Sequence, residues 1–208
     1  MSTGAILSGS RGRLRGRLRE VREDVILDVA EELLLARGYG DMSMDELAAQ
    51  TGMSKATLYH FFPSKLELAV GVVCRGMNKC ATILEAAVQG TQPLPLEQAF
   101  RTCLREKAAV DTMDMGLPRS AIVAHEAFRE LHDHLHALLD ELLERGRRGV
   151  VLAAWVSTPA FIAIVEGVFK CGASFDTLAA AAGSSREELI DGVTRIIFQG
   201  IRGPNAPA

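Results

Sequence analysis

Residues 42–65 read MSMDELAAQTGMSKATLYHFFPSK, and the capping and turn residues in this stretch decide the fold of the N-terminal region. Ser43 and Glu46 have the spacing of a capping box, in which the hydroxyl accepts from one backbone amide and the carboxylate accepts from another. A helix is therefore expected to begin after Ser43 and to end at Gly52, whose conformational freedom suits a helix C-terminus.

A second short helix is expected directly after this one. Ser54 is a good N-cap for residues 55–61, and Pro63 ends that helix because it disfavours helical geometry in the residue before it. Ser64 and Glu67 repeat the capping-box spacing and predict the start of a further helix. Two short helices joined by a glycine-containing turn form a helix-turn-helix.

A longer helix is predicted before the motif, over residues 19–37, with Gly38 as its C-terminal stop. Its apolar stripe consists of Val21, Val25, Ile26, Val29, Ala30, Leu33 and Leu34. The rest of a small three-helix core is expected from Leu47, Ala48, Leu58, Phe62 and Leu68.

The composition predicts an all-α protein. The chain has 208 residues, 48% of them hydrophobic and 24% charged, which is enough to bury one or two cores and excludes a mainly disordered chain. The four cysteines form no CxxC pair and the N-terminus lacks a signal-peptide segment, so we expect a cytoplasmic protein with reduced thiols. The most apolar stretch, residues 150–169, contains Pro159 and Glu166, so no membrane span is expected.

Positive charge is concentrated at the N-terminus. The net charge is −3, but residues 1–22 contain six arginines and one acid, Glu20. This local charge of about +5 leaves a negative remainder, so affinity for nucleic acid would have to be local. Residues 1–18 are interpreted as a basic flexible arm, and two roles stay open for it: a solvated terminus, or an arm that enters the minor groove of DNA.

The helix at residues 55–61 has the chemistry of a DNA-reading helix. Such a helix presents small or polar groups to base edges and donors to phosphates. Ala56 and the Thr57 methyl suit a thymine methyl, Lys55 suits guanine, and Tyr59, His60 and Lys65 suit phosphate oxygens. The candidate DNA-binding residues are Ser43, Ser54, Lys55, Ala56, Thr57, Tyr59, His60 and Lys65.

Residues 22–70 resemble the DNA-binding domain of the TetR/AcrR family of transcriptional regulators, because the cap, turn, Thr-Leu-Tyr, Phe and Ser-Lys positions occur in the family's order and spacing. Ala56 stands where that family often has Gly, and Leu66 where Glu is frequent. The resemblance implies a homodimer that binds double-stranded operator DNA and responds to a small-molecule effector through a divergent C-terminal domain.

The rest of the chain is expected to form a second helical region, with helices near residues 96–113, 118–148, 159–178 and 185–200. A segment ending near Val88 would precede them. The predicted division is therefore a basic arm at 1–18, a DNA-binding domain at 19–68, an effector-binding and dimerisation domain at 69–202, and a tail at 203–208.

The last two of these helices carry too many apolar residues for one buried stripe, and a second apolar face needs a second partner. The small residues Ala160, Ala163, Gly167 and Ala173 permit close helix approach, which favours a two-fold four-helix bundle between subunits. Burial of both helices within one subunit is the alternative. The candidate dimer-interface residues are Phe161, Val165, Val168, Leu189, Val193 and Ile197.

An apolar or amphipathic effector is expected among the C-terminal helices, and its binding would change the spacing of two recognition helices through the helix that begins after Ser64. Release of a repressor is the default interpretation, and activation stays open. The candidate effector-binding residues are Phe100, Cys103, Leu104, Met113, Phe128 and Trp155. Each of them is equally consistent with packed core.

Catalysis and metal binding have weaker sequence support. His125, His132 and His136 fall on one helix face, so a zinc or nickel site is geometrically conceivable, but exposed or interface histidines are the default interpretation and no metal or cofactor is assigned. A di-metal carboxylate enzyme would need two Glu-x-x-His pairs, and the sequence contains none. A helical adaptor without DNA binding would leave Tyr59 and Lys65 unexplained. We therefore expect a non-enzyme.

Overall fold

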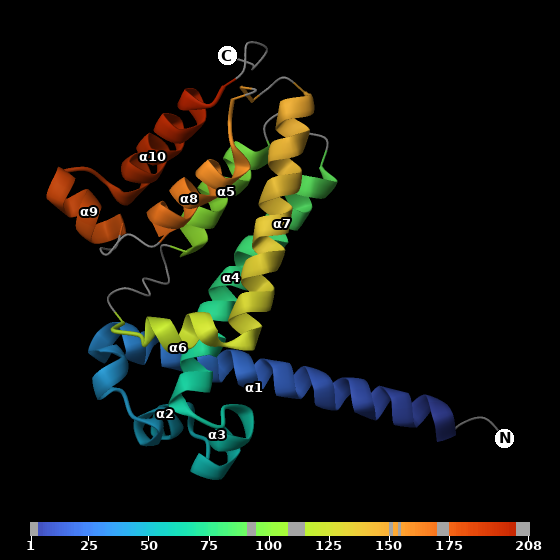
Figure 1. Cartoon of the computed structure of the whole chain (residues 1–208). Helices are drawn as coiled ribbons and strands as arrows, with labels where there is room; N and C mark the ends of the chain where they lie inside the picture. The colour runs from blue at the N-terminus through green and yellow to red at the C-terminus, as the bar shows by residue number, and fades with distance from the viewer. Residues whose placement is uncertain are drawn as a thin grey trace.

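The protein is built entirely from helices in the residues that its computed structural model describes, which are 4–90, 95–107, 115–149, 152–153, 155–169 and 175–202 (Figure 1). The predicted all-α class is confirmed. The helices are α1 (Gly4–Asp41), α2 (Met44–Thr51), α3 (Lys55–Phe61), α4 (Lys65–Gln89), α5 (Pro95–Lys107), α6 (Arg119–Ala124), α7 (Glu126–Arg148), α8 (Thr158–Phe169), α9 (Phe175–Ala182) and α10 (Arg186–Gly200).

Helix α1 is longer than the sequence pattern predicted. It begins at Gly4 rather than near residue 19, so the segment interpreted as a flexible arm is helical from that point. Four arginines and three leucines in residues 4–18 are strong helix formers and favour this conformation, although the four glycines of the same segment oppose it. The predicted stop at Gly38 corresponds to a kink, where φ is 76° and a residue with a side chain would be strained.

The three helix starts that the capping residues predicted are confirmed. Ser43, Ser54 and Ser64 are the N-caps of α2, α3 and α4, and each Oγ accepts from a backbone amide three residues ahead at 3.1 Å. Gly52 ends α2 in the left-handed conformation. The glutamates behave differently from the prediction: Glu46 pairs with Arg37 at 2.9 Å, and Glu67 accepts from His125 Nε2 at 3.1 Å.

Two separate hydrophobic cores hold the chain together. The N-terminal core is formed by helices α1, α2 and α3 and the first part of α4. A segment from much later in the chain is also part of it, with Met115, Leu117 and Ile122 buried there. The amide of Tyr39, next to the α1 kink, donates to the carbonyl of Met115 at 2.5 Å. The segment at residues 115–122 therefore packs as part of the N-terminal domain, although it lies within the range expected for the effector domain.

The C-terminal core is formed by the distal part of α4 with α5, α7, α8 and α10. Its aromatic centre is Phe198, whose ring lies 5.6 Å from Phe100 and 6.0 Å from Phe161 between centroids. Helix α4 runs from the DNA-binding domain into this core, beside α7 (Figure 1). One continuous helix thus contributes to both cores.

The C-terminal helix boundaries match the prediction less closely. The single stretch expected at 118–148 is two helices, because the chain is extended at His125, with ψ of 137°. The stretch expected at 159–178 is also two helices, α8 and α9. The last helix begins as expected after Ser185, which forms a complete capping box with Glu188. No helix among the described residues has the length and apolarity that crossing a membrane requires.

Candidate nucleic-acid interface

Helix α3 turns one face to its own domain and the other to solvent. Leu58 is completely buried and Phe62, just beyond the helix, is nearly so. Lys55, Ala56 and Tyr59 are exposed, as is His60. The spacing of these four residues places them along one side of the helix, opposite Leu58. The sequence therefore folds α3 as a platform with a small and polar outer face.

The hydroxyl groups at the start of α3 are engaged with one another. Ser54 Oγ accepts from the Thr57 amide and lies 2.8 Å from Thr57 Oγ1. Thr57 is only partly exposed, whereas Ser54 and Ser43 are exposed. These caps fix the N-termini of α2 and α3, and helix N-termini favour anions.

Lys55 forms an ion pair with Asp45, whose Oδ2 lies 2.6 Å from the lysine Nζ. Both side chains are about 60% exposed, so solvent screens the pair and its contribution to stability is small. Opening the pair to contact a base or phosphate would therefore cost little.

Lys65 has a structural role that connects two helices. Its Nζ donates to the carbonyl of Gly40 at 3.1 Å and lies 4.6 Å from the centre of the Tyr39 ring. These contacts join the start of α4 to the kinked end of α1. Lys65 can also reach toward solvent, but its removal would disturb this junction.

One arginine of α1 contacts the end of α3. The guanidinium of Arg19 lies 5.9 Å above the centre of the Phe61 ring, and Arg22 is exposed one helical turn further along the same face. Arg17 is exposed on a different side of the helix. The run of arginines in the sequence signalled a basic element, but the helical geometry that brings Arg19 to α3 was not predicted.

Comparison with known proteins agrees with this geometry. Residues 26–72, which contain α2 and α3, match the family model described as bacterial regulatory proteins, tetR family. These residues form a DNA-binding domain of the TetR family of transcriptional regulators. The resemblance inferred from residues 22–70 is thereby confirmed, and the helix-turn-helix is the DNA-binding element of such a regulator.

Relatives of this chain include the HTH-type transcriptional regulator EthR of Mycobacterium tuberculosis, which is 34% identical over 105 residues. That match covers 49% of this chain and 49% of EthR, so the chain spans about half the length of the curated relatives it matches.

Solved structures extend the likeness in fold to most of the chain. FadR from Bacillus halodurans has a TM-score of 0.67 at 16% identity, and the match covers 88% of this chain and 97% of that one. FadR from Bacillus subtilis, solved in complex with stearoyl-CoA, has a TM-score of 0.65 at 15% identity, with 86% and 98% covered.

The residues proposed to bind an effector do not all come together. Phe100, Cys103 and Leu104 are buried side by side on α5 in the C-terminal core. Phe128 instead packs against the N-terminal core, Trp155 is 71% exposed, and Met113 lies outside the described residues. A hydrogen bond with Cys80, and then burial, raise the pKa of the Cys103 thiol, so this side chain is neutral and suits an apolar surrounding.

The residues proposed for the dimer interface divide into two groups. Phe161 and Val165 are almost completely buried by their own subunit, so they retain little surface for a partner. Val168, Val193 and Ile197 are partly buried against the same core, and Leu189 is partly exposed. The apolar side chains that face outward are instead Ile164, 50% exposed on α8, and Ile196, 77% exposed on α10.

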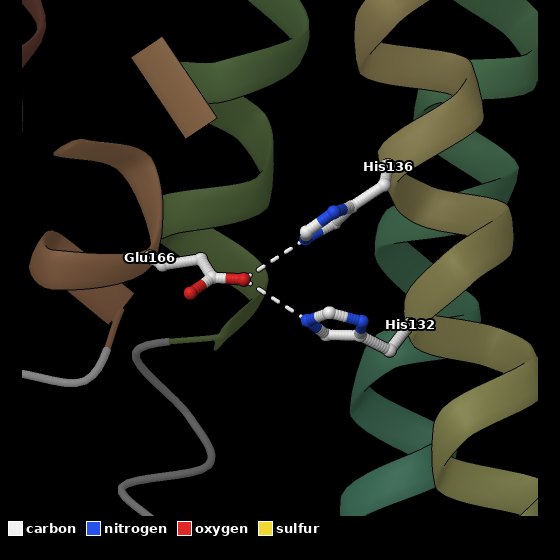
Figure 2. Close-up of side chains that lie close together, drawn as sticks. All are labelled: His132, His136 and Glu166. Carbon is white, nitrogen blue, oxygen red and sulfur yellow. Dashed lines mark hydrogen bonds and ion pairs between the residues drawn. The ribbon is translucent and has the colours of Figure 1, made fainter. Parts of the chain in front are cut away.

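The histidines of α7 and its N-cap residue, His125, also separate. His125 contacts Glu67 and His134 contacts Glu85, at 3.1 and 2.8 Å. His132 and His136 both point to Glu166 of α8, and each Nε2 lies 2.9 Å from the same carboxylate oxygen (Figure 2). The sequence placed His125, His132 and His136 on one face but gave no sign of Glu166 as their partner, because that contact joins residues about 30 positions apart.

Proposed function

We propose that this TetR-family protein is a homodimeric repressor that leaves a palindromic operator when a small molecule binds its C-terminal domain. The observation that carries the proposal is the outer face of α3. Its side chains are exposed to solvent and do not belong to the hydrophobic core: Lys55, Ala56, Tyr59 and His60. A recognition helix needs such a face to enter the major groove. The proposal includes no catalysis and places the protein in the cytoplasm, beside the chromosome.

Direct contact with DNA is assigned to two sets of residues. Ala56, Thr57 and Lys55 would meet base edges, while Tyr59, His60 and Lys65 would donate to phosphates, with the capped helix starts at Ser43 and Ser54 adding backbone donors. Arg19, which lies against Phe61 of α3, and Arg22, which is exposed one turn further along α1, would add phosphate contacts.

Dimerisation is assigned to the outer faces of α8 and α10. Ala160, Ala163, Ile164 and Gly167 are exposed at helical spacing, which leaves a stripe of small and apolar groups on α8. Ile196 is the most exposed large apolar side chain of α10. Two such faces related by a two-fold axis would form a four-helix bundle and would set two α3 helices about one turn of DNA apart, roughly 34–36 Å.

The route from effector to DNA is assigned to α4 and the segment at residues 115–122. Helix α4 belongs to both cores, and Met115 and Ile122 are buried among the side chains of the DNA-binding domain. A small molecule that displaced α5 or α7 would therefore move side chains that pack directly against the DNA-binding domain. Because two half-sites must be met together, a small rotation lowers specific affinity strongly.

An apolar or amphipathic effector has further support from the related fold of Bacillus subtilis FadR, solved with stearoyl-CoA. Phe100, Cys103 and Leu104 offer a compatible lining on α5. A relative named as a transcriptional activator, FasR of Mycolicibacterium smegmatis, is 37% identical over 73 residues, covering 35% of this chain and 33% of FasR, so activation is the second candidate sign.

The deciding experiment is selection of bound sequences from a random DNA pool, followed by footprinting. We expect a palindrome with two half-sites. Replacing Tyr59 by Ala should weaken binding to it by about 1–3 kcal/mol while leaving thermal stability nearly unchanged, because this side chain is 44% exposed. Gln89→Ala at the exposed end of α4 is the matched control. Equal binding by the wild type and Tyr59→Ala would reject the assigned interface.

A further inference from the structure

The pair of histidines on α7 and the glutamate on α8 form a compact cluster between two helices (Figure 2). The candidate ligand atoms of His132, His136 and Glu166 all lie within 4.8 Å of one another. Each side chain is about 30% exposed, so the cluster is half-buried and can be reached from solvent. It lies in the C-terminal region, away from the DNA-binding residues.

We propose that His132, His136 and Glu166 bind a first-row divalent transition metal ion of the zinc class. Two imidazole nitrogens and one carboxylate oxygen are a donor set that proteins use for zinc, and also for iron, cobalt and nickel, with a further position left for water or an exogenous ligand. The calcium and magnesium ions prefer all-oxygen surroundings and fit this set poorly.

The backbone positions these ligands in advance. His132 and His136 are four residues apart on α7, so their side chains project from consecutive turns of one face. Their ring centroids are 4.0 Å apart. Glu166 approaches from a different helix, α8, so the three ligands converge from two elements as a stable metal site requires.

The distances suit replacement of two hydrogen bonds by an ion. In the structure each Nε2 faces Glu166 Oε1 at 2.9 Å. A metal at about 2.0–2.2 Å from each donor would bind the Nε2 lone pairs once the imidazole N–H moves from Nε2 to Nδ1. The proton moves within each ring, and no other covalent bond changes in this step.

Neighbouring groups are placed to orient His132 in that form. Asp133 Oδ1 lies 3.4 Å from His132 Nδ1, on the side away from Glu166, where it can accept the relocated N–H. A carboxylate behind a metal-bound histidine commonly fixes its tautomer and raises its basicity. The ring of Phe128 stacks on His132 with centroids 5.8 Å apart and an angle of 24°, which restrains the rotation of the imidazole.

The test is a titration of tag-free, reduced full-length protein with Co²⁺, followed by its visible absorption, with no DNA present. We expect one equivalent to bind, Zn²⁺ to displace it, and Mg²⁺ to leave it in place. His136→Ala and Glu166→Gln should each raise the Kd by at least about tenfold. His134→Ala is the matched control, because His134 lies on the same helix but contacts Glu85 instead.

Circular dichroism of each variant checks that the helices persist. If an alanine variant unfolds, His132→Gln and His136→Gln decide, since an amide can still donate to Glu166 but replaces imidazole poorly as a ligand. Absence of Co²⁺ binding to the wild type, unchanged binding by His136→Ala and Glu166→Gln, or a thiolate charge-transfer band would overturn the proposal. Because no DNA enters the measurement, its failure would leave the proposed repressor function untouched.

Discussion

The Ser-x-x-Glu pattern begins one helix in the C-terminal region and two in the N-terminal region, and its glutamate behaves differently in the two places. In α10, Ser185 and Glu188 satisfy each other's amides, at 3.2 and 2.8 Å. In α2 and α4 the serine caps the helix, but the glutamate side chain pairs with a residue outside its own helix. Glu46 pairs with Arg37, and Glu67 pairs with His125.

This difference separates local from tertiary roles of the same motif. A closed capping box stabilises only its own helix, whereas a glutamate released from the box connects its helix to another. Glu46 joins α2 to α1, and Glu67 joins α4 to the break between α6 and α7. The first pair therefore acts inside the DNA-binding region, the second connects that region to the start of α7, and the closed box at Ser185 acts within α10 alone.

The largest effect is expected at the outer face of α8 and α10. Ile196→Asp should dissociate the proposed dimer, because it would bury an unpaired carboxylate in each subunit. A monomer engages one half-site, so operator affinity should fall roughly a thousandfold or more, toward non-specific binding. Analytical ultracentrifugation and a binding titration measure the two effects.

Ile196 is a sharper probe than Val193 or Ile197, which pack partly against their own core. At 77% exposure in the subunit, an aspartate at position 196 should leave the fold intact. Val123→Asp is the control. Val123 is 53% exposed on α6, and Figure 1 shows α6 at the opposite end of the molecule from α10. A folded, monomeric Ile196→Asp variant that binds the palindrome as tightly as wild type would reject the dimer mechanism.

The next effect tests whether the two cores are separate. Ile122 is 4% exposed and belongs to the N-terminal core, so Ile122→Ala should destabilise that core by about 2–5 kcal/mol. Hydrogen exchange should show faster opening of α2 and α3, with little change at α8 and α10. Leu139→Ala, in the C-terminal core, should give the reverse pattern. Equal responses of both regions to both variants would show one cooperative core instead of two.

Sequence reasoning was most successful where local signals decide the structure. The caps at Ser43, Ser54 and Ser64 and the turn at Gly52 are local, and all four positions are confirmed. The start of α1 was missed because arginine-rich termini and arginine-rich helices have the same composition, and only the helical propensity of Arg and Leu favours the second.

The remaining site residues depend on contacts between distant segments. Nothing near Glu166 in the sequence indicates two histidines of α7, and nothing near Ile122 indicates burial against the DNA-binding domain. The apolar pattern of α8 and α10 showed that two faces exist, but only packing decided that Phe161 faces inward and Ile164 outward. Periodicity gives relative positions on a helix, and tertiary structure gives the direction of each face.

A smaller effect is expected from the arginines of α1. If the face of α1 beside α3 contacts phosphates, Arg19→Gln and Arg22→Gln should each lower the slope of log affinity against log salt by about 0.9, since each neutralised phosphate releases counterions. Arg17→Gln is the matched control, because Arg17 is exposed on the same helix but on another side. An equal loss of slope for all three variants would mean that the charge acts at long range and not by contact.

The smallest effect is expected from the closed capping box, and its sign follows from pH. Hydrogen bonds from the backbone and side chain of Ser185 lower the pKa of Glu188. A carboxyl whose pKa is lower in the folded state adds stability above its unfolded pKa, about 4.3 for glutamate, and loses that contribution as the pH falls through the folded-state pKa.

Glu188→Gln should therefore be less stable than wild type at neutral pH, and the difference in Tm should shrink to near zero in acid. Ser185→Ala should remove only part of this pH dependence, because it deletes the hydroxyl that donates to the carboxylate at 2.9 Å but keeps the backbone amide of residue 185, which lowers the pKa most. If the Tm difference between wild type and Glu188→Gln persisted unchanged in acid, position 188 would act through helix propensity or packing and not through its charge. The closed box at Ser185 would then differ from those at Ser43 and Ser64 only in hydrogen-bond geometry.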